Sequence, residues 1–459
     1  MKGVQNYILR QSLPLLLLLY IIGSIVLIIK FKGVGTEADS ITHFLIAKYA
    51  PQYPELFLDH WGKPIFTLLA SPFAQWGFVG IKIFNALCVG INLVLIFKIC
   101  RHLNFKFPAL AGFFYLLFPL TLSTTYTGLT EPLFASFLIT AIWLLLKGKV
   151  SIALVLISFT PFIRSEGLII ILAFGLFQSL HAKWKSLPYL LAGHLLFALI
   201  GAFYFKDFFW VFNRIPYANI GSPYGSGDWF HFFDKMTYVM GIPLMILFWL
   251  GFVGFSYKSL KKGFPLPNKL FIPACFLAFF LAHSLFWSLG IFNSMGLKRV
   301  FAALTPLMAI LTLWGFENIF QLLNHNIRKV LQFALLGYIL VFPFTSNPAA
   351  TDFKSDLSLT EKQLALSNYE IVPAGKRLVY ADPYLSLRYG IDPFNPNDYL
   401  QLHRNNWELI QKGDLIIWDN WHAPVDGGIE KERLEKMVIK GKLNKVSELG
   451  NYYRVYVAL

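Results

Sequence analysis

Four polar stretches of the sequence carry side chains that could do chemistry, and each borders a long apolar segment. The first stretch reads Gly35-Thr36-Glu37-Ala38-Asp39-Ser40, and His43 follows one helical turn after Asp39. A carboxylate at the start of an amphipathic segment suits a general base that takes a proton from an acceptor held at an interface. The alternative is structural, because Glu37 and Asp39 would also favour the first turn of a surface helix.

Three later stretches carry an acid, a basic residue or both: Thr130-Glu131-Pro132, Arg164-Ser165-Glu166-Gly167 and Lys298-Arg299. The planar guanidinium of arginine matches the oxygens of a phosphate group, so the two stretches that contain Arg164 and Arg299 could bind a phosphorylated ligand. Two of them also have a structural interpretation. A threonine, an acid and a proline commonly begin a helix, and Arg164 could simply pair with Glu166 between two helices.

Membrane helices must position these stretches. Hydrophobic residues make up 56% of the 459 residues and charged residues 14%, and the mean hydropathy is +0.56. Ordinary soluble proteins have roughly 25% charged residues. The sequence therefore predicts an all-α polytopic membrane protein with about eleven spans of roughly 20 apolar residues each, at residues 12–29, 81–99, 108–124, 131–147, 151–163, 167–181, 187–205, 237–257, 270–290, 299–318 and 330–346. The apolar stretch Pro64–Phe78 is interrupted by prolines, so we expect a short interfacial or re-entrant helix there.

The basic residues predict the orientation, because cytoplasmic loops are enriched in lysine and arginine. Alternate loops of this chain carry most of these residues, among them Lys98, Arg101, Lys147, Lys149 and Lys261. With the N-terminus inside, the first loop lies outside. An odd number of spans then places residues 347–459 outside as well. Lys298-Arg299 then lies outside against this bias, which suggests a functional reason for the two charges.

The composition also argues against several kinds of protein. The net charge of +15 could suggest nucleic-acid binding, but the basic residues are spread over helix ends. Cys88, Cys100 and Cys275 fall in apolar segments, so no disulfide framework is expected. The sequence has no P-loop, dinucleotide-binding fingerprint or zinc-type spacing. We therefore expect no nucleic-acid partner, no cofactor and no metal.

The last hundred or so residues have a different character. Arg377–Asp382 (RLVYAD) and Asp414–Asp419 (DLIIWD) are typical of short buried strands, Glu430–Lys442 of a helix, and Tyr452–Val457 of a final strand. We predict two domains: a transmembrane domain at residues 1–346, whose catalytic first outside loop covers residues 30–80, and a small extracytoplasmic α/β domain at residues 347–459.

The first loop resembles that of the GT-C superfamily of membrane glycosyltransferases, which use lipid-phosphate-linked sugars. These proteins typically carry an acidic motif after the first span, then an aromatic or histidine position and an Ile-Ala-Lys/Arg stretch. Asp39-Ser40, His43 and Ile46-Ala47-Lys48 fill those places. The Asp-Ser pair is similar to the form in GPI-pathway-type mannosyltransferases more than to the Asp-Glu pair of protein O-mannosyl and aminoarabinose transferases. Ser40 stands where the second acid would be, which leaves open whether Glu37 substitutes for it.

The resemblance continues over roughly residues 12–320. His60-Trp61-Gly62-Lys63-Pro64 is similar to the Lys-Pro-Pro interfacial helix of the aminoarabinose and protein-mannosyl branch, with Ile65 replacing the second proline. The resemblance implies Asp39 as the catalytic base. It also implies a set of substrate-binding residues around the sugar and the donor phosphate: Glu37, His43, His60, Lys63, Glu131, Arg164, Glu166, Lys298 and Arg299.

Together the residues and the resemblance predict a glycosyltransferase that inverts the configuration at the anomeric carbon. It would move a sugar such as mannose from a polyprenyl-phosphate donor to a lipid, glycan or protein acceptor at the outer face of a bacterial inner membrane. Two alternatives remain: a transporter or flippase of lipid-linked sugars, and a polymerase or ligase of surface polysaccharide. A mere membrane anchor would need far fewer spans.

Overall fold

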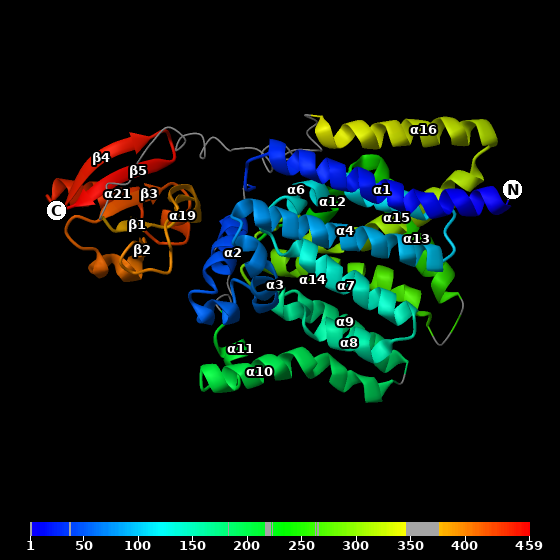
Figure 1. Cartoon of the computed structure of the whole chain (residues 1–459), viewed down its shortest axis with the longest axis horizontal. Helices are drawn as coiled ribbons and strands as arrows, with labels where there is room; N and C mark the ends of the chain where they lie inside the picture. Colours follow the sequence, from blue (N-terminus) through cyan, green and yellow to red (C-terminus); the bar gives the residue numbers. More distant parts are fainter. Residues whose placement is uncertain are drawn as a thin grey trace.

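The computed structural model describes residues 2–35, 38–181, 183–215, 222, 224–261, 263, 266–345 and 376–459, and at residues 2–11, 322 and 344 the backbone alone. Apolar helices dominate the first part of the chain, and a small sheet with helices forms the last part (Figure 1). Within the described residues, six helical segments are long and apolar enough to cross a bilayer: α1 (Lys2–Lys30), α4 (Phe78–His102), η3 with α10 (Trp184–Tyr204), α13 (Ile242–Leu260), η4 with α14 (Asn268–Leu289) and η5 with α15 (Lys298–Ile319).

A seventh candidate span consists of two short helices. α5 (Pro108–Leu117) and α6 (Pro119–Thr125) are bent by 67° around Phe118, because Pro119 cannot donate the hydrogen bond that would continue the helix. The remaining helices of the bundle are shorter or less apolar: α3 (Pro64–Ala74), α7 (Glu131–Leu146), α8 with η2 (Val150–Phe162), α9 (Gly167–Leu180) and α16 (His325–Val341). The structure confirms a polytopic, mainly helical membrane protein, while the count of eleven spans stays a prediction.

The core of the bundle forms around η5 and α15. In their most apolar stretch 94% of the residues are buried inside the protein, against 6% in that of α1. α13 crosses α15 at very short range. A Cβ atom on Gly251 would lie 1.9 Å from the carbonyl oxygen of Leu311, and one on Gly315 would lie 2.0 Å from that of Leu247. Small residues at such crossings let helix backbones touch, which is a common way to pack helices in membranes.

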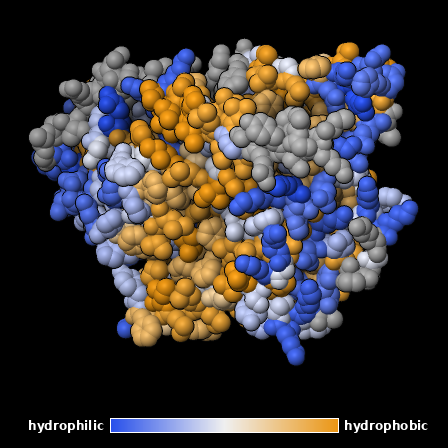
Figure 2. Space-filling model, turned by 45° about the vertical axis from the view of Figure 1, so that its right-hand side comes forward, coloured by the Kyte–Doolittle hydropathy of each residue, from blue (hydrophilic) through white to orange (hydrophobic). Residues whose placement is uncertain are grey.

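Large apolar side chains cover the outside of the bundle. Leu19 and Ile22 of α1, Leu172 of α9 and Phe203 of α10 are all more than half exposed. On the face shown in Figure 2, apolar residues form a broad continuous area with hydrophilic residues on both sides of it. Such an area would be unfavourable in water and fits contact with lipid chains.

One end of the bundle carries additional short elements, and the N-terminus lies at the other end (Figure 1). The 3₁₀ turn η1 (Pro54–Leu58) connects α2 (Ala38–Tyr49) to α3. α3 packs against both α2 and α4. α3 agrees with the predicted short helix from Pro64, although it ends at Ala74. The predicted span 237–257 begins only at Ile242, because Gly241, with a φ of 81°, separates α13 from α12 (His231–Met240).

Residues 376–459 form a five-stranded mixed sheet in the order β2-β1-β3-β5-β4. β1 (Leu378–Tyr380) runs parallel to β2 (Tyr399–Gln401) and β3 (Leu415–Asp419), while β5 (Tyr453–Ala458) is antiparallel to β3 and β4 (Leu443–Leu449). Three helices accompany the sheet: α19 (Pro383–Tyr389), α20 (His422–Val425) and α21 (Lys431–Ile439). β1, β3, α21 and β5 fit the predicted elements, whereas β2 and β4 were not predicted. The predicted domain boundary at residues 346–347 lies outside the described residues.

The C-terminal sheet domain rests on α2. α19 packs against α2, and Figure 1 shows the domain at the same end of the bundle as α2 and α3. The Tyr53 hydroxyl donates a hydrogen bond of 2.9 Å to Asp392 Oδ2. The Phe394 ring lies 6.0 Å from the ring of Tyr49 and 5.9 Å from that of Tyr53.

Candidate active site

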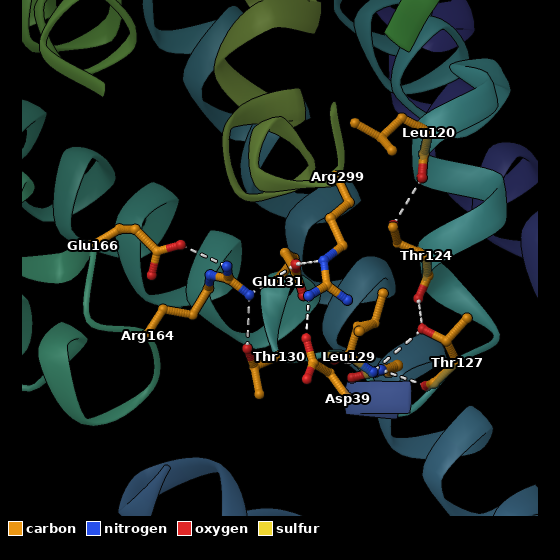
Figure 3. A network of polar contacts seen from close by, with 11 residues as sticks. Asp39, Leu120, Thr124, Thr127, Leu129, Thr130, Glu131, Arg164, Glu166 and Arg299 are labelled. Carbon is orange, nitrogen blue, oxygen red and sulfur yellow. Dashed lines mark hydrogen bonds and ion pairs between the residues drawn. The ribbon is translucent and has the colours of Figure 1, made fainter. Parts of the chain in front are cut away.

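Charged side chains from five segments of the chain meet at the α2 end of the bundle, and five of these side chains are drawn in Figure 3. They come from α2, the residue before α3, the start of α7, the turn before α9, and η5. Three are carboxylates and three are cations. We call them the charged cluster: Asp39, Glu131, Glu166, Lys63, Arg164 and Arg299.

Arg299 lies between two of the carboxylates. Its Nη2 forms an ion pair with Asp39 Oδ2, and its Nε lies 4.0 Å from Glu131 Oε1. The side chain of Asp39 is 27% exposed and that of Glu131 is 0% exposed. Asp39 is therefore the partner of Arg299 on the open side of the cluster, and Glu131 is its partner on the buried side.

Arg164 is held on both sides by acids. Its Nη1 lies 2.8 Å from Glu131 Oε1 and donates a hydrogen bond of 3.2 Å to Thr130 Oγ1. Its Nη2 lies 2.6 Å from Glu166 Oε1. The local pair of Arg164 and Glu166 that the sequence suggests does form, but it belongs to a larger network in which Glu131 serves both arginines.

Lys63 joins the cluster from α3. It precedes the first residue of α3 with a φ of 64°, a conformation that is uncommon for a residue with a Cβ atom. A hydrogen bond of 2.6 Å from Gly62 N to Asp59 Oδ1 closes the turn before it. The Lys63 Nζ then donates a hydrogen bond of 3.0 Å to Ser165 Oγ, in the turn that carries Arg164 and Glu166.

The first turn of α2 is fixed by buried hydrogen bonds around Ser40, which is 0% exposed. The Ser40 hydroxyl donates to Val34 O at 2.8 Å and accepts from Gly128 N at 2.7 Å. The loop around Gly128 is held in turn by Asn85 of α4, whose amide donates to Thr127 O and Leu129 O. A Cβ atom on Gly128 would lie 2.0 Å from Ser40 O, so this close contact requires glycine.

The charge state of Asp39 follows from its position. Burial alone would raise the pKa of its carboxyl, but the positive charge of Arg299, with a smaller contribution from Arg164, lowers the pKa to about 2. Asp39 is therefore ionised at neutral pH. A carboxylate with such a low pKa is also a weak base, so the ion pair limits its use as a proton acceptor.

His43 lies one turn after Asp39 but on the buried side of α2. It is 6% exposed, and its ring centroid lies 5.6 Å from that of Phe66. Burial lowers the pKa of the imidazole to about 3, although the nearby Asp39 carboxylate acts in the opposite direction. His43 is therefore neutral at physiological pH and adds no positive charge to the site.

Besides His43, two predicted site residues are not part of the cluster. His60 lies against Trp210 of α11 (Trp210–Asn213), with ring centroids 4.8 Å apart and Nε2 3.4 Å from Trp210 O. Lys298 Nζ lies over the ring of Tyr238 at 5.3 Å from the centroid. Glu37 lies outside the described residues, so its substitution for the missing second acid stays a prediction.

Several supporting residues were not predicted from the sequence. Asn85 could have been found, because a polar side chain inside an apolar span usually has a specific partner. Thr130 and Ser165 stand inside predicted motifs, but nothing local shows that they accept hydrogen bonds from Arg164 and Lys63. Tyr224 gives no local signal either. Its hydroxyl lies 3.4 Å from Asp426 Oδ1 of the sheet domain, and burial with the negative charges of Asp426 and Asp39 raises its pKa to about 12.

The arrangement provides two chemical capacities side by side. The three cations of the cluster can hold an anionic group such as phosphate. The Asp39 carboxylate, on the more exposed side, can accept a proton from a second molecule. Among the described residues, no group of three His, Cys, Asp or Glu side chains is placed to hold a metal ion.

These observations define an integral membrane protein with a charged site at one end of a helical bundle and a small α/β domain at the same end. No protein-family model and no curated protein sequence matches the chain. Solved structures do resemble it. The crystal structure of ArnT from Cupriavidus metallidurans bound to undecaprenyl phosphate has a TM-score of 0.62 at 10% identity, over 96% of this chain and 98% of that chain. The structure of the same protein in the apo state has a TM-score of 0.59 at 10% identity, over 96% and 97% of the two chains.

The similarity covers the helical bundle and the sheet domain together, since almost the whole of both chains is matched. It confirms the predicted fold class: the chain has a fold like that of ArnT, a mainly helical membrane bundle with a small C-terminal α/β domain. At this level of identity the comparison establishes the fold alone.

Proposed function

We propose that this protein is a glycosyltransferase that transfers a sugar from a polyprenyl-phosphate donor to an acceptor hydroxyl. The observation that carries the proposal is the charged cluster, in which Asp39 stands beside Arg299 and Arg164 at the end of an ArnT-like bundle. The ArnT crystal structure bound to undecaprenyl phosphate supports a donor of this kind. The fold does not specify the sugar. We propose mannose because the Asp39-Ser40 motif is similar to that of GPI-pathway-type mannosyltransferases.

The proposed reaction is a single displacement. Asp39 accepts the proton of the acceptor hydroxyl, and the hydroxyl oxygen forms a bond to the anomeric carbon of the sugar. The bond between that carbon and the phosphate oxygen breaks, and its electron pair leaves with polyprenyl phosphate. Attack from the side opposite the leaving group inverts the anomeric configuration. Arg164, Arg299 and Lys63 stabilise the negative charge that develops on the phosphate oxygen.

We propose that the C-terminal domain covers the acceptor side of this site. Asp392 and Phe394 of the domain contact Tyr49 of α2 and Tyr53 just after it, which supports this role. Tyr224 adds a second support, because its hydroxyl lies 3.4 Å from Asp426 Oδ1 of the domain, and burial together with the charges of Asp426 and Asp39 raises its pKa. An acceptor that reaches Asp39 would then pass between the bundle and the domain, at the outer face of a bacterial inner membrane.

The experiment that tests this function uses purified protein in detergent and a panel of radiolabelled polyprenyl-phosphate sugars. The wild type should bind one donor saturably and release polyprenyl phosphate by slow transfer to water. Asp39→Asn should still bind that donor but release product at least about 100-fold more slowly, because a positioned general base contributes about 10²–10⁴-fold to a rate. Glu55→Gln is the matched control, since Glu55 is an exposed acid of the same loop.

The other outcomes point to other functions. Donor binding without release by either protein, even after an acceptor panel is added, would favour a flippase of lipid-linked sugars. An absence of binding to every donor would favour a polysaccharide polymerase or ligase. Full activity of Asp39→Asn at an unchanged protein level would reduce Asp39 to a residue that begins a helix.

A further inference from the structure

The two arginines of the cluster are held to different degrees. Arg164 contacts Glu131 at 2.8 Å, Glu166 at 2.6 Å and Thr130 at 3.2 Å. Arg299 has Glu131 at 4.0 Å on one side and Asp39 on the other. Glu131 is fully buried and sits at the first residue of α7, so it can act as a fixed anchor for both guanidinium groups. The contact between Arg299 and Asp39 is the one that faces outward.

The charges of the cluster balance without a ligand, because the three carboxylates match the three cations. A phosphate group that enters adds at least one negative charge to a largely buried site. Buried charges are unfavourable unless they are paired. The incoming group therefore needs a cation that can leave its present partner. Arg299 can do so most readily, because Asp39 is the most exposed acid of the cluster, at 27% against 18% for Glu166 and 0% for Glu131.

Asp39 can also tolerate the loss of its partner. It lies in the first turn of α2, where the helix dipole stabilises a negative charge. Its partly exposed side chain can regain contact with water. Without the adjacent guanidinium, the proton affinity of the carboxylate rises, since Arg299 is the largest influence that lowers it in the free protein. The carboxylate then becomes a better base.

We propose that Arg299 exchanges partners when the donor binds: it leaves Asp39 for the donor phosphate while Glu131 continues to anchor it, and Asp39 thereby becomes an effective base. Glu131 is a positioning residue in this scheme. The inference rests on the proposed function and deepens it, because it makes donor binding the event that prepares the base. It implies an ordered reaction in which the donor binds first and the acceptor second.

The test is a double-mutant cycle on binding of polyprenyl phosphate, which carries the phosphate but no sugar to transfer. Equilibrium dissociation constants are measured at pH 7.5 in lipid nanodiscs for the wild type, Asp39→Asn, Arg299→Gln and the double variant. Asp39→Asn should bind at least about tenfold more tightly than wild type, or about 1.4 kcal/mol, because Arg299 no longer has to leave a carboxylate. Arg299→Gln should bind more weakly than wild type.

The decisive comparison is the effect of Asp39→Asn in the Arg299→Gln background. If the two residues compete through a shared guanidinium, this second effect should fall to about twofold or less. An equal tightening in both backgrounds would mean that Asp39 merely repels the phosphate, and it would overturn the exchange. No tightening in the wild-type background would overturn it as well. Thermal unfolding of each variant shows whether the compared proteins are equally folded.

The positioning role of Glu131 has its own readout. Glu131→Gln should weaken polyprenyl-phosphate binding despite the loss of a negative charge, because Arg164 and Arg299 would lose the partner that fixes their positions. The conservative Glu131→Asp should restore part of the affinity. Unchanged or tighter binding in Glu131→Gln would remove the anchor from the scheme. The cycle also separates the inference from the proposed function. If the wild type does not bind polyprenyl phosphate at all, the proposed function and the exchange both fail. If the wild type binds it but Asp39→Asn has the same effect in both backgrounds, only the exchange fails.

Discussion

The Ser40 hydroxyl hydrogen-bonds to the surrounding backbone: it donates to Val34 O and accepts from Gly128 N. The position corresponds to a second acid in part of the superfamily that the sequence resembles. A carboxylate at this site would be larger and would lose the hydrogen bond to Val34 O, in a space where Gly128 already touches the Ser40 backbone. The chain therefore uses Ser40 to fix the direction of Asp39, and it obtains its other acids from Glu131 and Glu166.

The sequence could predict which residue types meet in the cluster, but not how they pair. Asp39, Glu131 and Arg299 were recognised because acids and arginines at the ends of apolar segments need a reason to be there. Their pairing could not be predicted, since Arg299 follows Asp39 by 260 residues. His60 and Lys298 belong to the same motifs yet contact Trp210 and Tyr238. Sequence spacing places a residue on an element, but packing decides the direction of its side chain.

The buried His43 gives a prediction at this scale. The folded protein binds a proton at the imidazole with a pKa of about 3, and the unfolded chain does so with a pKa near 6.5. Acid therefore favours the unfolded chain, by up to about 1.4 kcal/mol for each pH unit below 6.5. His43→Gln should make the melting temperature in detergent less dependent on pH between 6.5 and 4.5. An equally steep decline in both proteins would show that His43 does not carry this effect.

Among the elements, the strands that escaped prediction are the two edges of the sheet. β1 and β3 are buried apolar runs that end in turn residues, which makes them easy to recognise. β2 is only three residues long and half exposed, and β4 carries lysine and glutamate on its exposed positions. Edge strands are commonly short or charged because these features prevent association with other chains. The bend between α5 and α6 was missed too, although Pro119 marks it.

The contact between α2 and the sheet domain gives a prediction at the scale of elements. Phe394 packs against two tyrosines of the α2 region, and aromatic pairs contribute about 0.5–1.5 kcal/mol each. Phe394→Ala should loosen the domain and speed hydrogen exchange of the backbone amides in the second half of α2. Ile439→Ala is a control in the same domain, because Ile439 is 85% exposed on α21. Unchanged exchange in Phe394→Ala would mean that the domain does not support α2.

For the whole molecule, charge distribution predicts the orientation, and one acid in the basic loops has an explanation. Glu317, at the end of α15, accepts a hydrogen bond of 2.8 Å from Phe107 N at the start of α5. It therefore accepts from a backbone N–H at the N-terminus of α5 that has no partner within the helix, and a negative charge is favourable there. The remaining loops at that end are basic, as expected on the cytoplasmic side.

Cysteine labelling tests this orientation directly. Cys88, Cys100 and Cys275 are buried, so they should react little with a membrane-impermeant maleimide. Exposed positions then serve as reporters in single variants. Gln52→Cys and Asn451→Cys should react in intact cells, and Lys149→Cys should react only after the membrane is opened. Labelling of Lys149→Cys but not of Gln52→Cys in intact cells would invert the proposed topology.

The alternation of sign in the charged cluster has a consequence for how this protein changes over evolutionary time. From Asp39 through Arg299, Glu131 and Arg164 to Glu166, every charge is neighboured by its opposite. Replacement of the fully buried Glu131 would leave its two arginines without their shared partner, and loss of one partner of a buried ion pair costs about 3–5 kcal/mol. Substitutions here should therefore survive only in compensating pairs, while lipid-facing positions drift freely. Distant relatives of the chain would be recognised by five charges in the order acid, acid, base, acid, base, even where no continuous motif has survived.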